Sequence, residues 1–297
     1  RSYKTNKYSI TIKMAQRIEF TKMHGAGNDY IYINTMRFPI AHPEKLAIAW
    51  SDRHKGIGGD GIILIGKNES GRFTMRIFNN DGSEGKMCGN GIRCVGKYLY
   101  DNGITSEKEL PIDTLSGTKL LHMMTDADNK VVEVTVDMGE PILADKHQLS
   151  TPDGSMQDGE VTIDHTNYRG TFVSMGNPHF INFINGVEEY DVQTNGVRLE
   201  QAQIFPERCN IEFAEIRPDG SIRMRVWERG SGITMACGTG ACATAVAAAL
   251  TGRAGRTSTI VMDGGQLTIV WNENDNHIYM TGPATTVFTG TIELPEE

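Results

Sequence analysis

Alternating apolar and polar residues recur along the chain and predict β-strands. Residues 74–78 and 222–227 alternate in polarity and end in turn-forming residues, as half-buried strands do. Other strand-like runs cover residues 62–65, 131–136, 211–213 and 259–262. Because these strands do not alternate regularly with helices, the pattern disfavours a doubly wound parallel sheet.

Helical character follows two short cysteine motifs. Residues 92–100 and 241–250 are predicted helices, and a glycine closes each of them, Gly103 and Gly252. Many strands with one prominent helix per half favour an α+β fold, in which each half is a mixed sheet curled around a central helix.

The chain repeats itself once. The motif that begins with Cys88, CGNG, recurs 149 residues later as CGTG at Cys237. The same shift also aligns MRIF (75–78) with MRVW (224–227), and GN (27–28) with GN (176–177). Several matches at one offset indicate duplicated units, so we predict two pseudo-symmetric domains that each carry one cysteine motif.

The repeat also suggests where the domains begin and end. The predicted N-terminal domain, with Cys88, comprises residues 17–135 together with 283–297. The predicted C-terminal domain, with Cys237, comprises residues 136–282. Residues 1–16 are interpreted as an extension or a tag.

Composition narrows the class of protein. Hydrophobic residues make up 39% and charged residues 22%, as in ordinary globular chains. Lys and Arg number 29 against 37 Asp and Glu, and the net charge of −8 disfavours a binder of nucleic acid or of anionic membranes. No apolar stretch approaches the roughly 20 residues of a bilayer span. Five cysteines in 297 residues do not form a disulfide framework, so we expect a cytoplasmic protein.

Cys88 and Cys237 each stand just before a predicted helix, with glycines at the next and third positions. A thiol there lies at the positive end of the helix dipole, which predicts a lowered pKa. The glycines let backbone N–H groups approach a carboxylate. If the two elements face each other, one thiolate can remove a proton from a carbon while the other thiol delivers a proton to the opposite face. The pattern therefore predicts stereoinversion by two bases without a cofactor.

The alternative for these two thiols is structural burial, the common fate of free cysteine. Their matched contexts favour chemistry instead. Cys94 and Cys242 lie among apolar residues of the predicted helices and are assigned to the core, whereas Cys209 fits either a site or the core. The spacings contain no CxxC pair and no HExxH motif, so no metal site is predicted.

A glycine-rich run at residues 56–61 formally matches the dinucleotide fingerprint GxGxxG. That fingerprint requires a helix after the glycines, but residues 62–65 resemble a strand. Nucleotide binding is therefore disfavoured.

Several motifs together resemble the diaminopimelate epimerase family, and the resemblance extends from about Ile18 to residues 282–284. The motifs are KMHGAGND (22–29), FNNDGSE (78–84), MCGNG (87–91), MGNPH (175–179), FPERCN (205–210), ERG (228–230) and ACGTG (236–240). The resemblance implies a cofactor-independent enzyme that interconverts LL- and meso-diaminopimelate in the synthesis of lysine and cell-wall precursors. It also implies an active site in the cleft between two domains, and commonly a homodimer.

The resemblance also implies roles for individual residues. Cys88 and Cys237 match the two acid/base thiols, His179 matches a histidine held to influence them, and Glu228 and Arg229 match an acidic-basic pair. Glu228 is a candidate for both catalysis and substrate binding. The remaining candidates for substrate binding are Asn28, Asn79, Asn177 and Asn210, with the backbone donors at Gly89, Asn90, Gly238 and Thr239.

This set suits a substrate with two ammonium-carboxylate ends. Asparagines supply neutral donors and acceptors, and Arg229 offers a fork for one carboxylate. Each residue also has a structural alternative, such as a turn asparagine, a solvated Glu228–Arg229 pair or a loop cap at His179. One departure is visible, because some family members have a substrate-contacting glutamine where this chain has Gly61.

Two alternative functions remain open. Proline and hydroxyproline racemases also use paired cysteines, but they typically have His after the first Cys-Gly, where this chain has Asn90. Their smaller substrate has no second charged end. From another class, the chain fits a thiol redox protein or a non-catalytic amino-acid binder, although a redox role predicts a nearby resolving cysteine.

Overall fold

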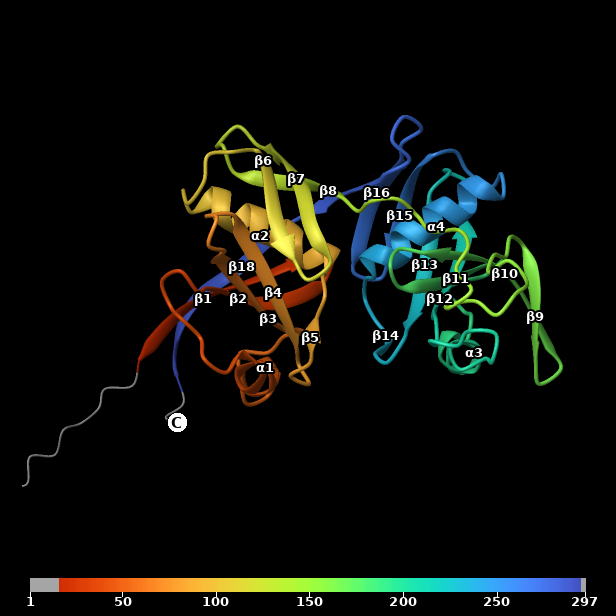
Figure 1. Cartoon of the computed structure of the whole chain (residues 1–297), viewed down its shortest axis with the longest axis horizontal. Helices are drawn as coiled ribbons and strands as arrows, with labels where there is room; N and C mark the ends of the chain where they lie inside the picture. Colours follow the sequence, from red (N-terminus) through yellow and green to blue (C-terminus); the bar gives the residue numbers. More distant parts are fainter. Residues whose placement is uncertain (1–15, 295–297) are drawn as a thin grey trace, which may run out of the picture.

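The fold is known from a computed structural model, which describes residues 16–294. The predicted extension therefore lies outside the described residues except for Gln16. Figure 1 shows two lobes side by side, with one long helix inside each, α2 (Gly89–Asp101) and α4 (Gly238–Leu250). The predicted helices form one turn earlier than expected, immediately after each cysteine.

Apart from the first and the last strand of the second half, which have no counterpart in the first half, the other elements follow the same order in both halves. The first half contains β1 (Arg17–Gly25), β2 (Asn28–Asn34), α1 (Pro43–Ser51), β3 (Gly61–Lys67), β4 (Phe73–Asn79), β5 (Glu84–Gly85), β6 (Glu109–Thr114), β7 (Gly117–Thr125) and β8 (Val131–Asp137). The second contains β9 (Gly159–Ile163), β10 (Thr166–Ser174), β11 (Pro178–Phe183), α3 (Val192–Glu200), β12 (Asn210–Ile216), β13 (Ile222–Glu228), β14 (Gly232–Ile233), β15 (Thr257–Met262), β16 (Gly265–Trp271), β17 (Ile278–Pro283) and β18 (Thr285–Glu293).

The duplication is visible in the backbone. A shift of 149 residues carries β1, α1, β3, β4 and α2 onto β10, α3, β12, β13 and α4, with identical bounds. Every strand predicted from the polarity pattern lies within an observed strand, namely β3, β4, β8, β12, β13 or β15. The predicted α+β fold with an internal duplication is thus confirmed.

Strand pairing is also repeated. In the first half β2–β3 and β4–β6 are parallel, and in the second half β11–β12 and β13–β15 are parallel, while the neighbouring pairs are antiparallel. The halves join where β8 pairs with β17. The sheets are therefore mixed.

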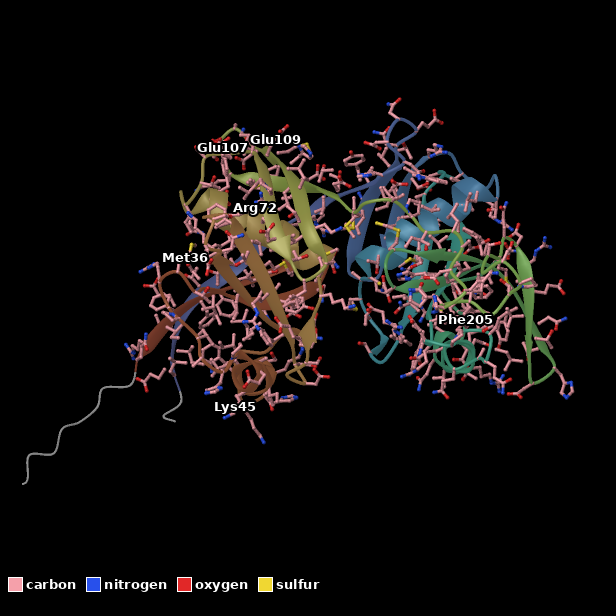
Figure 2. The ribbon with its side chains drawn as sticks, in the orientation of Figure 1. Met36, Lys45, Arg72, Glu107, Glu109 and Phe205 are labelled. Carbon is pink, nitrogen blue, oxygen red and sulfur yellow. The ribbon has the colours of Figure 1, made fainter. Side chains whose placement is uncertain are left out.

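Both faces of each sheet are covered, which explains the continuous apolar run in β3. Ile62 and Leu64 belong to the core under α1, whereas Ile63 and Ile65 belong to the core around α2 and α4. Successive strand residues point to opposite faces, so a strand buried on both sides has no polar alternation. The equivalent outer core of the second lobe surrounds α3 and includes Phe205 (Figure 2).

The end of the chain returns to its beginning. β18 pairs with β1 in antiparallel register, with Ile18 opposite Ile292. We propose the division of the folded chain into residues 17–135 with 283–297, and 136–282, because this pairing places β18 beside the first lobe. The first boundary lies inside β8. No helix among residues 16–294 is long and apolar enough to cross a membrane.

Candidate active site

The two cysteines at the repeated motifs cap the two long helices. The Cys88 sulfur accepts the N–H of Gly91 at 3.3 Å at the start of α2, and the Cys237 sulfur accepts the N–H of Gly240 at 3.4 Å at the start of α4. Each sulfur thus satisfies one of the free backbone donors of a helix N-terminus.

The two helix N-termini approach each other around Met280 of β17. A Cβ atom added to Gly89 would lie 2.5 Å from the Met280 methyl carbon, and one added to Gly238 would lie 3.2 Å from its sulfur. The Cβ position of Gly238 is also 3.8 Å from Oδ1 of Asn90. A side chain at either glycine would therefore press on Met280, which lies between the two helix N-termini.

The predicted lowering of the thiol pKa values was wrong. Burial raises the pKa of Cys88, against the opposing effects of the Gly91 N–H and the Arg93 charge. Burial also raises the pKa of Cys237 well above its usual value, and the carboxylates of Glu228 and Glu212 add to this shift. The helix N-terminus acts in the predicted direction at both sulfurs, but burial outweighs it.

Asp60 fixes the orientation of the Asn28 amide. Its carboxylate accepts the Asn28 side-chain N–H at 2.6 Å and the Asp29 backbone N–H at 3.1 Å. Because a carboxylate only accepts, Asn28 must turn Oδ1 the other way. That oxygen accepts the Cys88 thiol at 3.2 Å, so the structure holds Cys88 as a hydrogen-bond donor.

The equivalent hydrogen bonds in the second half run in the opposite direction, toward the Cys237 sulfur. The Asn177 amide nitrogen donates to the Thr239 hydroxyl at 3.4 Å, and this hydroxyl lies 3.6 Å from the Cys237 sulfur. Since Thr239 already accepts a hydrogen bond, its own proton is available to Cys237. The repeat partner of Asp60 is Cys209, which carries no charge to orient the asparagine.

His179 lies fully inside the second lobe and contacts a carboxylate that the sequence analysis missed. Its Nδ1 is 2.6 Å from Oε1 of Glu212, and neither side chain is exposed. A Cβ on Gly240 would lie 2.6 Å from the same oxygen, which places Glu212 beneath the start of α4. Glu212 lies between Ile211 and Phe213 in a strand buried on both faces. A charged residue between two apolar ones was the only signal in the sequence of its role.

Glu228 ends β13 beside both thiols. The Thr234 hydroxyl donates to its carboxylate, and burial raises its pKa. Its negative charge also raises the pKa of Cys88 and of Cys237. Glu228 is therefore not a solvated surface residue.

Asn210 and Arg229 are held together by the backbone. Oδ1 of Asn210 accepts the Arg229 backbone N–H at 2.9 Å, and its amide nitrogen donates to the Pro178 carbonyl at 2.9 Å. The Arg229 guanidinium donates to the Glu207 carbonyl at 2.8 Å. Asn210 thus positions Arg229 and keeps only one amide hydrogen for a ligand, whereas Asn79 donates to a neighbouring hydroxyl, that of Ser83, at 3.1 Å.

Gly61 can be no other residue in this backbone. A Cβ at this position would lie 2.1 Å from the Phe78 carbonyl oxygen, because β3 and β4 pair directly here. The glutamine found in some family members therefore has no room.

The remaining cysteines are structural. Cys94 and Cys242 are fully buried in the helices, as predicted, and Cys209 is fully buried with its thiol on the Asn210 carbonyl. Core packing is the correct alternative for Cys209. Among residues 16–294, no group of three or more His, Cys, Asp or Glu side chains could hold a metal ion.

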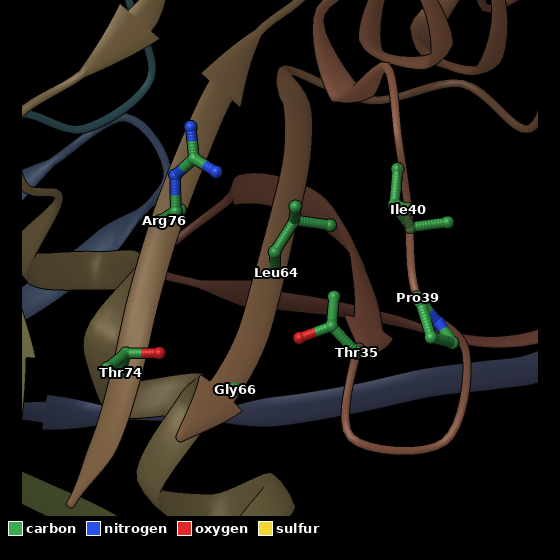
Figure 3. A pocket seen from close by; sticks show the side chains of 7 residues that line it. All are labelled: Thr35, Pro39, Ile40, Leu64, Gly66, Thr74 and Arg76. Carbon is green, nitrogen blue, oxygen red and sulfur yellow. The ribbon is translucent and has the colours of Figure 1, made fainter. Parts of the chain in front are cut away.

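A separate hollow of about 230 Å³ lies on the outer side of the first lobe. Figure 3 shows that Thr74 and Arg76 of β4 and Leu64 of β3 line it opposite Pro39 and Ile40. It contains none of the residues described above. The candidate active site is therefore the region of the helix N-termini and not this hollow.

The fold is shared with solved structures of a hydroxyproline epimerase and of a phenazine biosynthesis protein. A hydroxyproline epimerase from Agrobacterium vitis superposes with a TM-score of 0.68 at 15% identity, covering 96% of this chain and 95% of that one. A phenazine biosynthesis protein of the PhzF family from Bacillus anthracis does so with a TM-score of 0.68 at 14% identity, covering 94% and 100%. At these identities the likeness shows the fold alone.

Sequence comparison is more specific. A model described as diaminopimelate epimerase matches residues 20–144 and 171–287. A diaminopimelate epimerase from Phocaeicola vulgatus is 56% identical over 95% of this chain and 100% of its own length. One from Methanococcus maripaludis is 51% identical over 93% and 100%. The chain belongs to the diaminopimelate epimerase family.

We predict that Asp60→Ala makes the Cys88 thiol more acidic. Without the carboxylate, Asn28 can turn its amide N–H toward the sulfur, which favours the thiolate. The pH midpoint of Cys88 alkylation by iodoacetamide, followed by peptide mass spectrometry, should fall by about 0.5–1 pH unit.

The control is Asp60→Asn, which keeps one acceptor oxygen for Asn28 and should shift the midpoint less. Cys237 serves as an internal control in the same protein and should not change. An unchanged Cys88 midpoint in Asp60→Ala would show that Asp60 does not govern the amide.

Proposed function

We propose that the protein interconverts LL- and meso-2,6-diaminopimelate by proton transfer at the α-carbon, without a cofactor. The observation that carries the proposal is the pair of cysteines capping two helices whose N-termini meet at Met280. The family membership and the curated relatives named diaminopimelate epimerase support the same reaction.

The reaction proceeds between the two sulfurs. One of them, as thiolate, takes the proton from the α-carbon, and the electron pair of that C–H bond stays on carbon, delocalised into the carboxylate. The opposite thiol then gives its proton to the other face of the carbon. The configuration is inverted, and the negative charge has passed from one sulfur to the other, so the two sulfurs must exchange protons with solvent before another molecule of the same isomer reacts.

The helix N-termini hold the reacting end of the substrate in this proposal. Backbone N–H groups at Gly89-Asn90 and Gly238-Thr239 are suited to a carboxylate, since the N-termini are positive and carry free donors. The Glu228 carboxylate, which acts on both thiols, is suited to the α-ammonium. The ammonium brings positive charge beside the buried sulfurs, which favours the thiolate that burial disfavours.

We predict that Cys88→Ala and Cys237→Ala each abolish epimerisation, because each thiol serves one face of the carbon. Turnover of LL-diaminopimelate is measured by separating the isomers, beside L-proline as the alternative substrate. The matched control is Cys94→Ala, since the repeat already has Ala243 at the equivalent position.

Near-wild-type turnover in either active-site variant contradicts the two-base mechanism. Turnover of L-proline but not of diaminopimelate would instead favour the racemase alternative. Binding without turnover of either compound would favour a non-catalytic amino-acid binder.

Recognition of the far end of diaminopimelate is assigned to Arg229 with Asn79, Asn177 and Asn210. The Asn210 side-chain oxygen accepts the backbone N–H of Arg229. Among the described residues, the Arg229 guanidinium donates a hydrogen bond only to the Glu207 carbonyl. A planar fork is thus available for a carboxylate. Fixing the far end places the reacting carbon between the thiols, so remote binding contributes to turnover.

We predict that Arg229→Ala lowers kcat/KM for diaminopimelate by an amount equivalent to about 2–5 kcal/mol, because a substrate carboxylate loses its charged partner. Arg229→Lys should also be impaired, since a point charge does not replace a bidentate fork. The control is Arg217→Ala, which removes a surface arginine paired with Glu188. A loss of less than about threefold would show that Arg229 does not bind the substrate.

A homodimer is the assembly we propose, with β18 at the interface. This nine-residue strand pairs only with β1 among the described strands, so its other edge is free. Val287 and Phe288 on it are 54% and 46% exposed, and its first eight residues carry no charge. A long edge strand without such protection is suited to pair with another chain.

We predict that Val287→Lys converts the protein to a monomer in multi-angle light scattering. The charge would lie at the pairing edge, where its desolvation opposes association. Ile48→Lys is the control, because Ile48 is an apolar residue of similar exposure, 55%, on α1 and not on β18. A monomeric wild type, or a dimer that persists in Val287→Lys, contradicts this interface.

The proposed reaction belongs to lysine and peptidoglycan precursor synthesis, as the name of the family implies. We propose a cytoplasmic location, supported by the five cysteines, all of which are free thiols.

A further inference from the structure

Arg93 is a fully buried cation without a carboxylate partner. Its side chain has none of its surface exposed, one turn into α2. The guanidinium donates to neutral acceptors: the carbonyls of Gly89 at 3.3 Å and Pro283 at 3.2 Å, Oδ1 of Asn90 at 3.0 Å and, more weakly, the Met280 sulfur at 3.9 Å. No carboxylate in the described part of the chain forms an ion pair with it.

The fold is built to admit this guanidinium. A Cβ on Gly25 of β1 would lie 2.9 Å from Nη2 of Arg93, and one on Gly282 of β17 would lie 3.1 Å from its central carbon. These strands come from opposite ends of the chain. The side chain is thus enclosed where the two halves join.

The fold does not itself require a charge at this position. The repeat partner of Arg93 in α4 is Cys242, which is equally buried and neutral. The same helix therefore packs in the same kind of sheet without an arginine. Whatever Arg93 contributes is specific to the first half.

A buried charge without a counter-charge is strongly unfavourable. Here the positive ends of the α2 and α4 dipoles point to the same region, so the helices add to the cost and do not relieve it. Asn90, which accepts from Arg93, is also close to Gly238 at the start of α4. Such a region favours a bound anion.

We propose that Arg93 is a positioning residue for the two-thiol reaction. Its charge keeps the region where the helix N-termini meet at positive potential, and so stabilises negative charge on the substrate carboxylate and on Cys88. Arg93 also fixes the Asn90 amide. Because a guanidinium only donates, Asn90 must turn Oδ1 toward it, and the amide nitrogen is left as a donor. This inference rests on the proposed function.

The other groups around Cys88 do not supply this charge. They are Cys94 of α2, Tyr30 and Tyr32 of β2, and Glu228 at the end of β13. Burial raises the pKa of Cys88, Arg93 opposes the rise, and Glu228 adds to it. Arg93 is the cation beside Cys88.

The test replaces Arg93 with Met, which removes the charge at similar length, and with Lys, which keeps it. In Arg93→Met the pH midpoint of Cys88 alkylation by iodoacetamide should rise by about 0.5–1 pH unit, because loss of the cation favours the thiol. The midpoint of Cys237 should not move. In Arg93→Lys the Cys88 midpoint should stay close to that of the wild type. In Arg93→Met, kcat/KM for diaminopimelate should fall at least about tenfold.

The matched control is Arg223→Met. Arg223 is also buried, but it is paired with Glu188 and Asp263 and lies on β13. Its loss should lower the melting temperature without moving the Cys88 midpoint. If Arg93→Met likewise lowers the melting temperature and leaves the Cys88 midpoint unchanged, Arg93 is structural only.

Failure of the proposed function is a separate result. The alkylation profile needs no substrate, so it tests the effect of Arg93 on Cys88 even if the wild type does not turn over diaminopimelate. In that case a raised Cys88 midpoint supports the electrostatic effect of Arg93 on Cys88. The proposal that Arg93 stabilises a substrate carboxylate is then overturned.

Discussion

The convergence of two helix N-termini at one point is the constraint on which the rest of the structure depends. An N-terminus offers free N–H donors and a positive end of a dipole, and here two of them meet around a methionine. Glycines follow both cysteines, and a side chain at either position would press on that methionine. The pairing of β8 with β17 holds the halves, and therefore the helices, in this relation.

The backbone is nearly symmetric, but the charges are not. Asp60 has Cys209 as its repeat partner, and Arg93 has Cys242. Likewise, the buried His179–Glu212 pair occupies the positions of Tyr30 and Ile63, which belong to the first half and carry no charge at neutral pH. A reaction that inverts a carbon needs two opposed acid/base groups, which the duplication supplies. It must also hold a substrate whose ends and faces differ, and the charged residues that occur in only one half provide that difference.

The thiols show how tertiary burial can reverse a local argument. Both sulfurs cap helices, which by itself favours the thiolate. Cys237 is also buried and Cys88 half-buried, and removal of water disfavours the charged form more strongly than the N-terminus favours it. The same burial makes nearby charges effective, since little solvent screens Glu228 or Arg93 from the sulfurs.

The sequence alone determined several of the strands, the presence of a helix after each cysteine, the duplication at one offset and the two candidate thiols, because periodicity and turn chemistry are local properties. Only the tertiary structure decided which polar groups are hydrogen-bonded within the protein and which remain available to a ligand. Asn210 is occupied by backbone groups and Gly61 is forced by the Phe78 carbonyl. Glu212 reaches His179 from 33 residues away. Burial and hydrogen-bond partners depend on residues that are distant in the chain, and a motif does not encode them.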